Sequence, residues 1–133
     1  MISVIYGSAG SGKTAKLMAA ANDAAASATG QIIFITDNAQ SLGLAPGVKF
    51  INLAECGVKS EAEFIGFIKG MLAANYDIQK IYIDGLCRLL DLPAEKLEPV
   101  FDTMKNVTAE VDFIATVSGD KLPAYLKNYA LKA

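Results

Sequence analysis

A glycine-rich segment close to the start of the 133-residue chain fits the spacing G-x-x-x-x-G-K-[ST]. Its residues are Gly7, Ser8, Ala9, Gly10, Ser11, Gly12, Lys13 and Thr14. The segment stands between residues 2–6, an apolar run rich in β-forming residues, and residues 15–28, an alanine-rich run that favours helix. A strand, a tight turn and a helix are therefore expected in succession, which restricts the fold to those that contain a β–loop–α unit.

The same segment has the chemistry of a phosphate-binding loop. Its glycines let the backbone turn tightly and bring N–H groups against a chain of phosphates, and the positive end of the following helix adds to the attraction. Lys13 would place its ammonium group on the outer phosphates, and the hydroxyl of Thr14 would be one ligand of a hydrated Mg²⁺ ion. The alternative is a glycine-rich turn with an incidental lysine. The flanking strand and helix favour phosphate binding, because that mechanism requires both.

The composition limits which partners to expect. The length predicts one domain spanning residues 1–133. A formal net charge of −2 gives no electrostatic reason to expect DNA, RNA or an anionic membrane as the main partner, although a local basic patch stays open. The chain has no histidine, and its two cysteines lack metal-ligand spacing, which argues against a zinc site. Without a basic signal-peptide segment or an apolar run of about 18 residues, the protein is expected in the cytoplasm, away from membranes.

Hydrophobic patterning predicts strands and helices along the whole chain. Apolar β-forming runs predict five strands, at residues 2–6, 31–36, 48–53, 81–84 and 111–118. Helices are expected at residues 15–28, after the capping pair Ser60 and Glu63, and at residues 122–131. Pro93 and Pro99 predict a helical turn followed by a helix to about Ala109. Residues 85–92 are expected to form a loop. This order predicts a three-layer α/β sandwich with a mainly parallel five-stranded sheet and right-handed crossovers.

Polar residues follow three of these strands, at the edge where ligands bind in such sheets. Asp84 ends an apolar strand, and Asp37 and Ser118 stand at the ends of two others. In phosphate-loop proteins a carboxylate placed like Asp84 holds the Mg²⁺ ion, usually through water, whereas an aspartate can also end a strand because it favours turns. The convergence of these residues with the glycine-rich loop predicts a nucleotide site in which Asp84 is a metal ligand.

Four segments together resemble the ATPase core of RecA-like P-loop proteins. They are residues 4–14, 32–37, 81–85 and 117–119, and the resemblance covers nearly the whole chain. It implies the P-loop NTPase fold, with ATP and Mg²⁺ as cofactors. It also implies that the strand of Asp84 lies beside that of Ser118, which in turn lies beside the loop strand. By the same resemblance, Asp37 takes the place of the usual catalytic glutamate, and Ser118 that of a polar sensor of the γ-phosphate.

The chain differs from the family at the position of the catalytic base and in the number of its arginines. Asp37 is one methylene group shorter than the usual glutamate, and its alternative role is an Asx turn with Asn38. Arg88 is the sole arginine. Together with Lys121 and Lys127 it is a candidate for a transition-state cation donated by a neighbouring subunit, and a solvated surface cation is the favoured alternative for each.

Three classes of function are compatible with these residues. The leading one is a Mg-dependent ATPase that converts ATP to ADP and phosphate, in which Lys13 and the metal neutralise developing charge and Asp37 orients water. The second is a binding or regulatory module that binds nucleotide with little turnover. The third is a small-molecule kinase, since the start of the chain resembles adenosylcobinamide kinases. Those kinases use a histidine, which this chain lacks, and nucleotide-monophosphate kinases rely on several arginines.

The family sheet order would leave the strand at residues 2–6 at an edge with no later strand to cover it. An uncovered apolar edge invites pairing with another chain. We therefore expect a homo-oligomer or a protein partner in addition to the nucleotide. The assignment of ATP rather than GTP rests on the resemblance alone.

Overall fold

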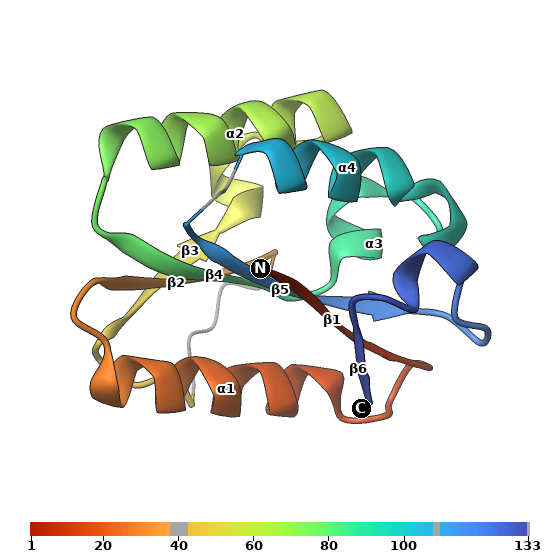
Figure 1. Cartoon of the computed structure of the whole chain (residues 1–133), viewed down its shortest axis with the longest axis horizontal. Coiled ribbons are helices and arrows are strands. Elements are labelled where there is room, and N and C mark those ends of the chain that lie inside the picture. The colour runs from red at the N-terminus through yellow and green to blue at the C-terminus, as the bar shows by residue number, and fades with distance from the viewer. Residues whose placement is uncertain (38–42, 108–109, 133) are drawn as a thin grey trace.

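The computed structural model describes residues 1–37, 43–107 and 110–132 (Figure 1). Its strands are β1 (Ile2–Gly7), β2 (Gln31–Thr36), β3 (Val48–Asn52), β4 (Ile78–Ile83), β5 (Asp112–Ser118) and β6 (Ala130–Lys132). Its α-helices are α1 (Lys13–Ser27), α2 (Glu61–Ala74), α3 (Leu86–Leu90) and α4 (Glu98–Val107). Three single-turn 3-10 helices are η1 (Leu53–Cys56), η2 (Ala94–Lys96) and η3 (Ala124–Leu126). None of the helices in the described ranges is both long and apolar enough to cross a membrane.

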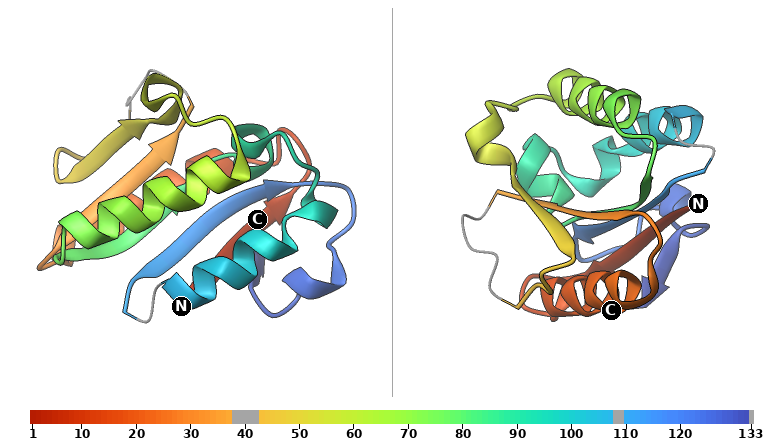
Figure 2. Two further views of the ribbon diagram at one scale, coloured as in Figure 1. Left: turned by 90° about the horizontal axis from the view of Figure 1, so that it is seen from above. Right: turned by 90° about the vertical axis from the view of Figure 1, so that its left-hand side faces the viewer.

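The strands form one sheet in which every neighbouring pair is parallel, in the order β3-β2-β4-β5-β1-β6. Helix α1 covers one face, and α2, α3 and α4 cover the other (Figure 1, Figure 2). The expected three-layer α/β class is confirmed. The neighbour relations are confirmed as well, since β4 lies beside β5 with Ile81 opposite Phe113, and β5 lies beside β1 with Ser118 opposite Gly7.

The C-terminal segment corrects one prediction. The sequence predicts a helix over residues 122–131, but the chain forms only the turn η3 there and then β6, which pairs parallel with β1. Val4 lies opposite Ala130, and the N–H of Val4 donates to the carbonyl oxygen of Tyr129 at 2.8 Å. Within the described residues the sheet thus has six strands rather than five. Because β6 covers β1, the expected self-association through an open β1 edge loses its basis.

Aromatic contacts explain why this segment does not continue as a helix. Tyr129 stacks on Phe101 of α4, with ring centroids 6.0 Å apart, and Lys105 Nζ lies 4.9 Å from the centroid of the Tyr129 ring. The ring of Tyr125 also lies near Phe101, at 6.1 Å. A helix through residues 122–131 would leave β1 unpaired on this side. The tyrosine contacts and the hydrogen bonds to β1 therefore outweigh local helix propensity.

The stretch after β4 corrects a second prediction. Residues 85–92 contain the short helix α3 and are not simply a loop. Three leucines of α3 are buried, at positions that share one helix face: Leu86, Leu89 and Leu90. Gly85 precedes the helix with a φ of 81°, a left-handed conformation that glycine adopts readily. The helical turn after Pro93 and the helix α4 are confirmed, and the predicted helix end near Ala109 lies outside the described residues.

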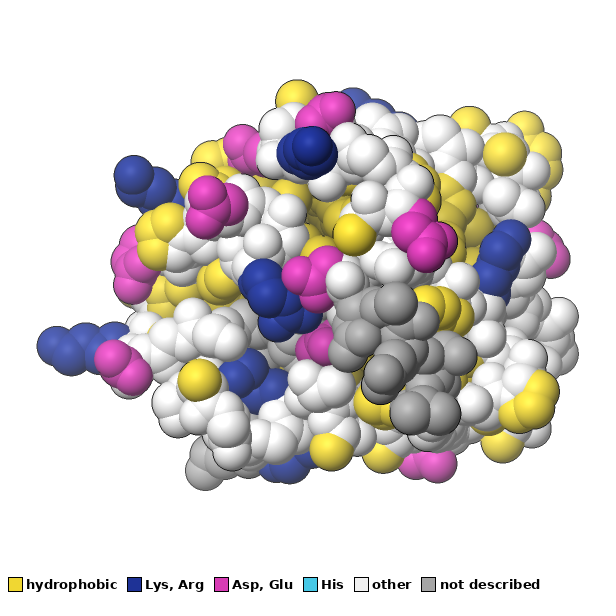
Figure 3. Space-filling model, turned by 180° about the vertical axis from the view of Figure 1, so that it is seen from behind, with side chains coloured by type: hydrophobic (Ala, Val, Ile, Leu, Met, Phe, Trp, Pro, Cys, Tyr) yellow, Lys and Arg dark blue, Asp and Glu magenta, His cyan; other side chains and the backbone are white. Residues whose placement is uncertain are grey.

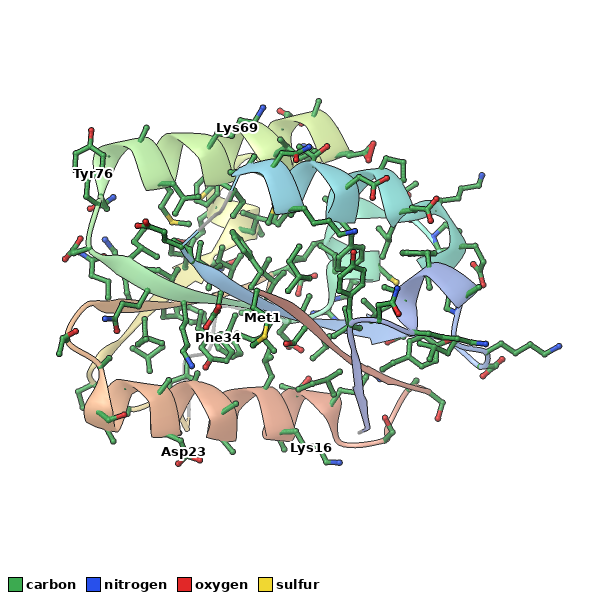
Figure 4. All side chains as sticks on the ribbon, viewed as in Figure 1. Met1, Lys16, Asp23, Phe34, Lys69 and Tyr76 are labelled. Atoms are coloured by element: carbon green, nitrogen blue, oxygen red, sulfur yellow. The ribbon has the colours of Figure 1, made fainter. Side chains whose placement is uncertain are left out.

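The sheet separates two hydrophobic cores. On one side Leu17 and Ala21 of α1 pack against strand residues that include Phe34. Figure 4 shows Phe34 between the sheet and α1, whereas Lys16 and Asp23 point away from the sheet. On the other side the core includes residues from α2, α3 and α4: Phe64, Ile68, Leu86, Val100, Phe101 and Met104. Helices on both faces thus leave the ends of the strands as the edges at which a site can open.

Replacing Phe64 by alanine should destabilise the fold strongly. Phe64 lies on α2 with an exposed fraction of 0%, so its truncation leaves a cavity and should lower the free energy of unfolding by about 3–5 kcal/mol. Tyr76→Ala is the matched control, because Tyr76 is 96% exposed and its loss should change that free energy by about 0.5 kcal/mol or less. Urea unfolding of both variants measures the difference. Equal effects would contradict the packing described above.

Candidate functional site

The glycine-rich loop joins β1 to α1 at the carboxyl edge of the sheet, at the right of Figure 1. Gly10 and Gly12 have φ values of 80° and 88°, in the left-handed region where other residues are strained. Gly12 is the N-cap of α1 and has no side chain to occupy the N–H groups of the first turn. The loop closes on its own backbone, since the N–H of Ser11 donates to the carbonyl oxygen of Ser8 at 3.2 Å. The first turn of α1 therefore presents its backbone donors without a side-chain cap.

Lys13 points back into this loop. Only 9% of the residue is exposed, and its Nζ donates to the carbonyl oxygen of Ser8 at 2.8 Å. A buried ammonium group needs such an acceptor because desolvating an unpaired charge costs free energy. The Lys13 ammonium group thus lies against the glycine-rich loop rather than in solvent, as the motif predicts.

A buried carboxylate joins the loop to the two central strands. The Thr14 hydroxyl donates to Asp84, with its Oγ1 3.0 Å from Oδ1 and 3.2 Å from Oδ2. Thr116 on β5 donates to the same Oδ1 at 3.0 Å, and its Oγ1 accepts the N–H of Gly85 at 2.6 Å. Asp84 and Thr116 are 7% and 1% exposed. Hydroxyl groups from two separate segments therefore hold one carboxylate in place.

These oxygen atoms are of the kind that Mg²⁺ prefers. Hydroxyl and carboxylate oxygens are hard ligands, and Mg²⁺ usually takes one or two of them from the protein and keeps several waters. Within the described part of the chain, no three histidine, cysteine, aspartate or glutamate side chains gather into a metal-chelating cluster. An ion at Thr14 and Asp84 would therefore complete its shell with water and phosphate oxygens. The residues present fit the expected metal.

Asp37 lies beyond β2 and is engaged by an arginine from α3. The Nε of Arg88 donates to Oδ1 and Oδ2 of Asp37 at 2.9 Å and 2.8 Å. The side chains of Asp37 and Arg88 are 32% and 56% exposed. The hydrogen bond from Arg88 holds the pKa of the Asp37 carboxyl below its usual value, and the same bond raises the pKa of the guanidinium. Arg88 is thus half exposed to solvent, as the favoured alternative of a solvated cation predicts, but it also forms an ion pair that was not predicted.

The alternative role of Asp37, an Asx turn with Asn38, involves a residue outside the described ranges. The other two candidate cations, Lys121 and Lys127, are exposed, as expected for surface lysines.

Ser118 is also exposed, at the end of β5. The carbonyl oxygen of Ser118 accepts a contact from the thiol of Cys87 at 3.8 Å, and burial raises the pKa of that thiol. Helix α3 therefore lies against the end of β5 through Cys87 and against Asp37 through Arg88.

The structure brings most of the predicted site residues to one edge of the sheet. Lys13, Thr14 and Asp84 form a connected group around the loop, and Ser118 is the last residue of the neighbouring strand β5. Asp37 lies on the other side of β4, paired with Arg88. Near the middle of the face seen in Figure 3, basic and acidic side chains lie side by side, and neither sign forms an extended patch there.

Thr116 was not predicted from the sequence, and Arg88 was predicted only as a candidate cation for a neighbouring subunit, not as the partner of Asp37. Thr116 is a polar residue inside the apolar strand β5, and this polar position was the one sequence feature that could have indicated its role. For Arg88 the sequence shows only its position, four residues after Asp84; its pairing with Asp37 spans 51 positions in the chain. Both contacts depend on how distant segments meet.

No model of a known protein family and no curated protein sequence matches this chain. The geometry of the loop, of the Asp84 cluster and of the Asp37–Arg88 pair is therefore the basis for assigning a function.

Thr116→Val should destabilise the protein although it keeps the shape of the side chain. The change removes a donor to Asp84 and leaves the N–H of Gly85 without its acceptor, which should cost about 1–3 kcal/mol. Thr116→Ser is the control, because it retains the hydroxyl. Thermal unfolding of both variants tests the cluster, and a valine variant as stable as wild type would show that the hydroxyl holds nothing together.

The pair of Asp37 and Arg88 should give the stability a dependence on acid pH. The folded-state pKa of Asp37 is lowered from its ordinary value of 3.8, so its contribution is present above pH 4 and is lost as the pH falls through the lower folded-state pKa. Asp37→Asn should cost about 0.2–1 kcal/mol at pH 7, since the pair is partly exposed, and nothing once the carboxyl is protonated. Urea unfolding from pH 7 to pH 2 measures this difference. Asp23→Asn, on the outer face of α1 (Figure 4), is the control for removing one surface charge.

Proposed function

We propose that this chain is an ATP-binding P-loop protein with a RecA-like core, and that it hydrolyses ATP to ADP and phosphate in a Mg-dependent reaction. One observation carries the proposal. Thr14 at the end of the loop and Asp84 at the end of β4 are 70 residues apart in sequence, yet their oxygens lie 3.0 Å apart. A hydroxyl and a carboxylate meeting beside a phosphate-binding loop support a nucleotide–magnesium site. The proposal implies the cytoplasm as its compartment.

Each residue of the loop has a distinct part in this proposal. The backbone N–H groups from Gly7 to Thr14 would bind phosphate oxygens, helped by the uncapped first turn of α1. Lys13 would exchange its present acceptor, the carbonyl oxygen of Ser8, for a phosphate oxygen. Thr14 and Asp84 would hold Mg²⁺, which when bound neutralises charge that develops on the phosphates.

Water activation is assigned to Asp37, and contact with the terminal phosphate to Ser118. Asp37 follows β2 and Ser118 ends β5, both at the edge that carries the loop. Because Arg88 lowers the pKa of Asp37, the carboxylate is ionised at neutral pH but is a weak proton acceptor. Its part in hydrolysis would therefore be to orient water more than to remove a proton.

Lys13→Ala should abolish phosphate release from MgATP. Removing the cation takes away electrostatic stabilisation of the transferred group, and we expect a loss of about 10²- to 10³-fold in turnover. Lys16→Ala is the matched control, because Lys16 lies one turn further along α1 and points away from the sheet (Figure 4). Phosphate release is measured for both variants over a series of protein concentrations. Undiminished turnover in Lys13→Ala would refute the proposed site, and a specific rate that rises with concentration would indicate a site completed between subunits.

The engagement of Asp37 by Arg88 favours a second candidate function. If Asp37 stays bound in the ion pair, the chain would bind nucleotide with little turnover and act as a regulatory or partner-binding module. In that case MgATP changes oligomeric state or partner binding while phosphate release stays at background. The concentration series described above separates these two functions when nucleotide binding is measured alongside it.

A further inference from the structure

Arg88 uses only part of its guanidinium to hold Asp37. The Nε atom donates to both carboxylate oxygens. Among the described residues, no hydrogen bond from Nη1 or Nη2 is present. These terminal groups carry most of the N–H donors of an arginine, in a planar fork that matches phosphate or carboxylate oxygens. Within the described residues the cation is therefore held through Nε alone, and its two terminal nitrogens make no hydrogen bond.

Because Gly85 has no side chain, it leaves room for this guanidinium. A Cβ at position 85 would lie 2.5 Å from Nη2 and 2.7 Å from Nη1 of Arg88, so a larger residue would displace the side chain. Gly85 directly follows Asp84, whose carboxylate contacts Thr14. The terminal groups of Arg88 thus lie against the backbone next to the proposed metal ligand. The Arg88 side chain as a whole is 56% exposed.

We propose that Arg88 binds the terminal phosphate of the nucleotide held by its own chain, and that Asp37 is the positioning residue that orients Arg88. This inference rests on the nucleotide site of the proposed function and adds a source of triphosphate selectivity to it, with or without turnover. Asp37 and the phosphate would use different nitrogens of the guanidinium, so the ion pair prepares the arginine for binding without competing for it. A planar cation fixed before the ligand arrives loses less conformational entropy on binding.

A simple structural role makes a different prediction. An ion pair that only fastens α3 to the end of β2 would change stability without distinguishing one nucleotide from another. A ligand of the terminal phosphate must instead favour a nucleoside triphosphate over a diphosphate. The ratio of the two dissociation constants is therefore the readout that separates the roles, and it does not depend on turnover.

The test compares the binding of a non-hydrolysable MgATP analogue with that of MgADP by titration calorimetry. Arg88→Gln should weaken binding of the analogue by about 10- to 100-fold, as expected for loss of a charge-assisted hydrogen bond, and should change MgADP binding by less than about twofold. Lys69→Gln is the control for removing one positive charge, because Lys69 points outward from α2 (Figure 4). Arg88→Lys keeps the charge without the fork and provides a second variant if the glutamine variant fails to fold.

Two substitutions of Asp37 test its positioning role. Asp37→Asn and Asp37→Ala remove the same charge, but only asparagine keeps an oxygen that can accept from Nε. We expect asparagine to retain most of the triphosphate preference and alanine to lose it as Arg88→Gln does. Equal preference in the two variants would show that Asp37 does not orient Arg88.

A mixing experiment separates an arginine of the same chain from one donated by a neighbour. Excess Lys13→Ala protein, which has an intact Arg88 but a damaged loop, is added to the Arg88→Gln variant. The triphosphate preference should stay low, and its restoration would overturn the assignment to the same chain. If wild-type protein binds neither nucleotide, the proposed function itself fails. If it binds both and Arg88→Gln leaves their ratio unchanged, only the present inference fails.

Discussion

The buried carboxylate of Asp84 is the point on which the candidate site depends. Burying a charge is costly unless donors replace the water it loses. Here the replacing donors are the hydroxyls of Thr14, from the start of α1, and of Thr116, from β5. The loop, β4 and β5 are therefore held in register by one group. The parallel sheet makes this arrangement accessible, because it brings the carboxyl ends of all its strands to the same edge.

The parts of the fold that the sequence predicted are those with local causes. Apolar runs predict strands, and the glycine spacing predicts a β–loop–α unit; both are present. The helix predicted for residues 122–131 is absent because the segment is ordered by distant contacts, through Tyr129 to Phe101 and to β1. Helix α3 was missed because five residues are too few for a helical period to stand out.

The residues of the candidate site were likewise predictable only where the cause is local in the sequence. Lys13 and Thr14 could be predicted because the motif alone fixes their local geometry, and Asp84 because it ends an apolar strand. The role of Thr116 and the pairing of Arg88 with Asp37 could not be predicted, since both appear only when β5 and α3 are placed beside β4 and β2. The β4–β5 and β5–β1 neighbour relations agree with the family resemblance.

The two carboxylates at this edge have opposite electrostatic situations, and that difference assigns their roles. Asp37 already has a cation, so its charge is largely compensated by Arg88. Asp84 is held by neutral hydroxyls, and no lysine or arginine among the described residues forms an ion pair with it. A divalent cation gains more from an uncompensated carboxylate than from one already paired. We therefore expect magnesium at Asp84. The positive charge of Arg88, held by Asp37, is then available to a negatively charged phosphate.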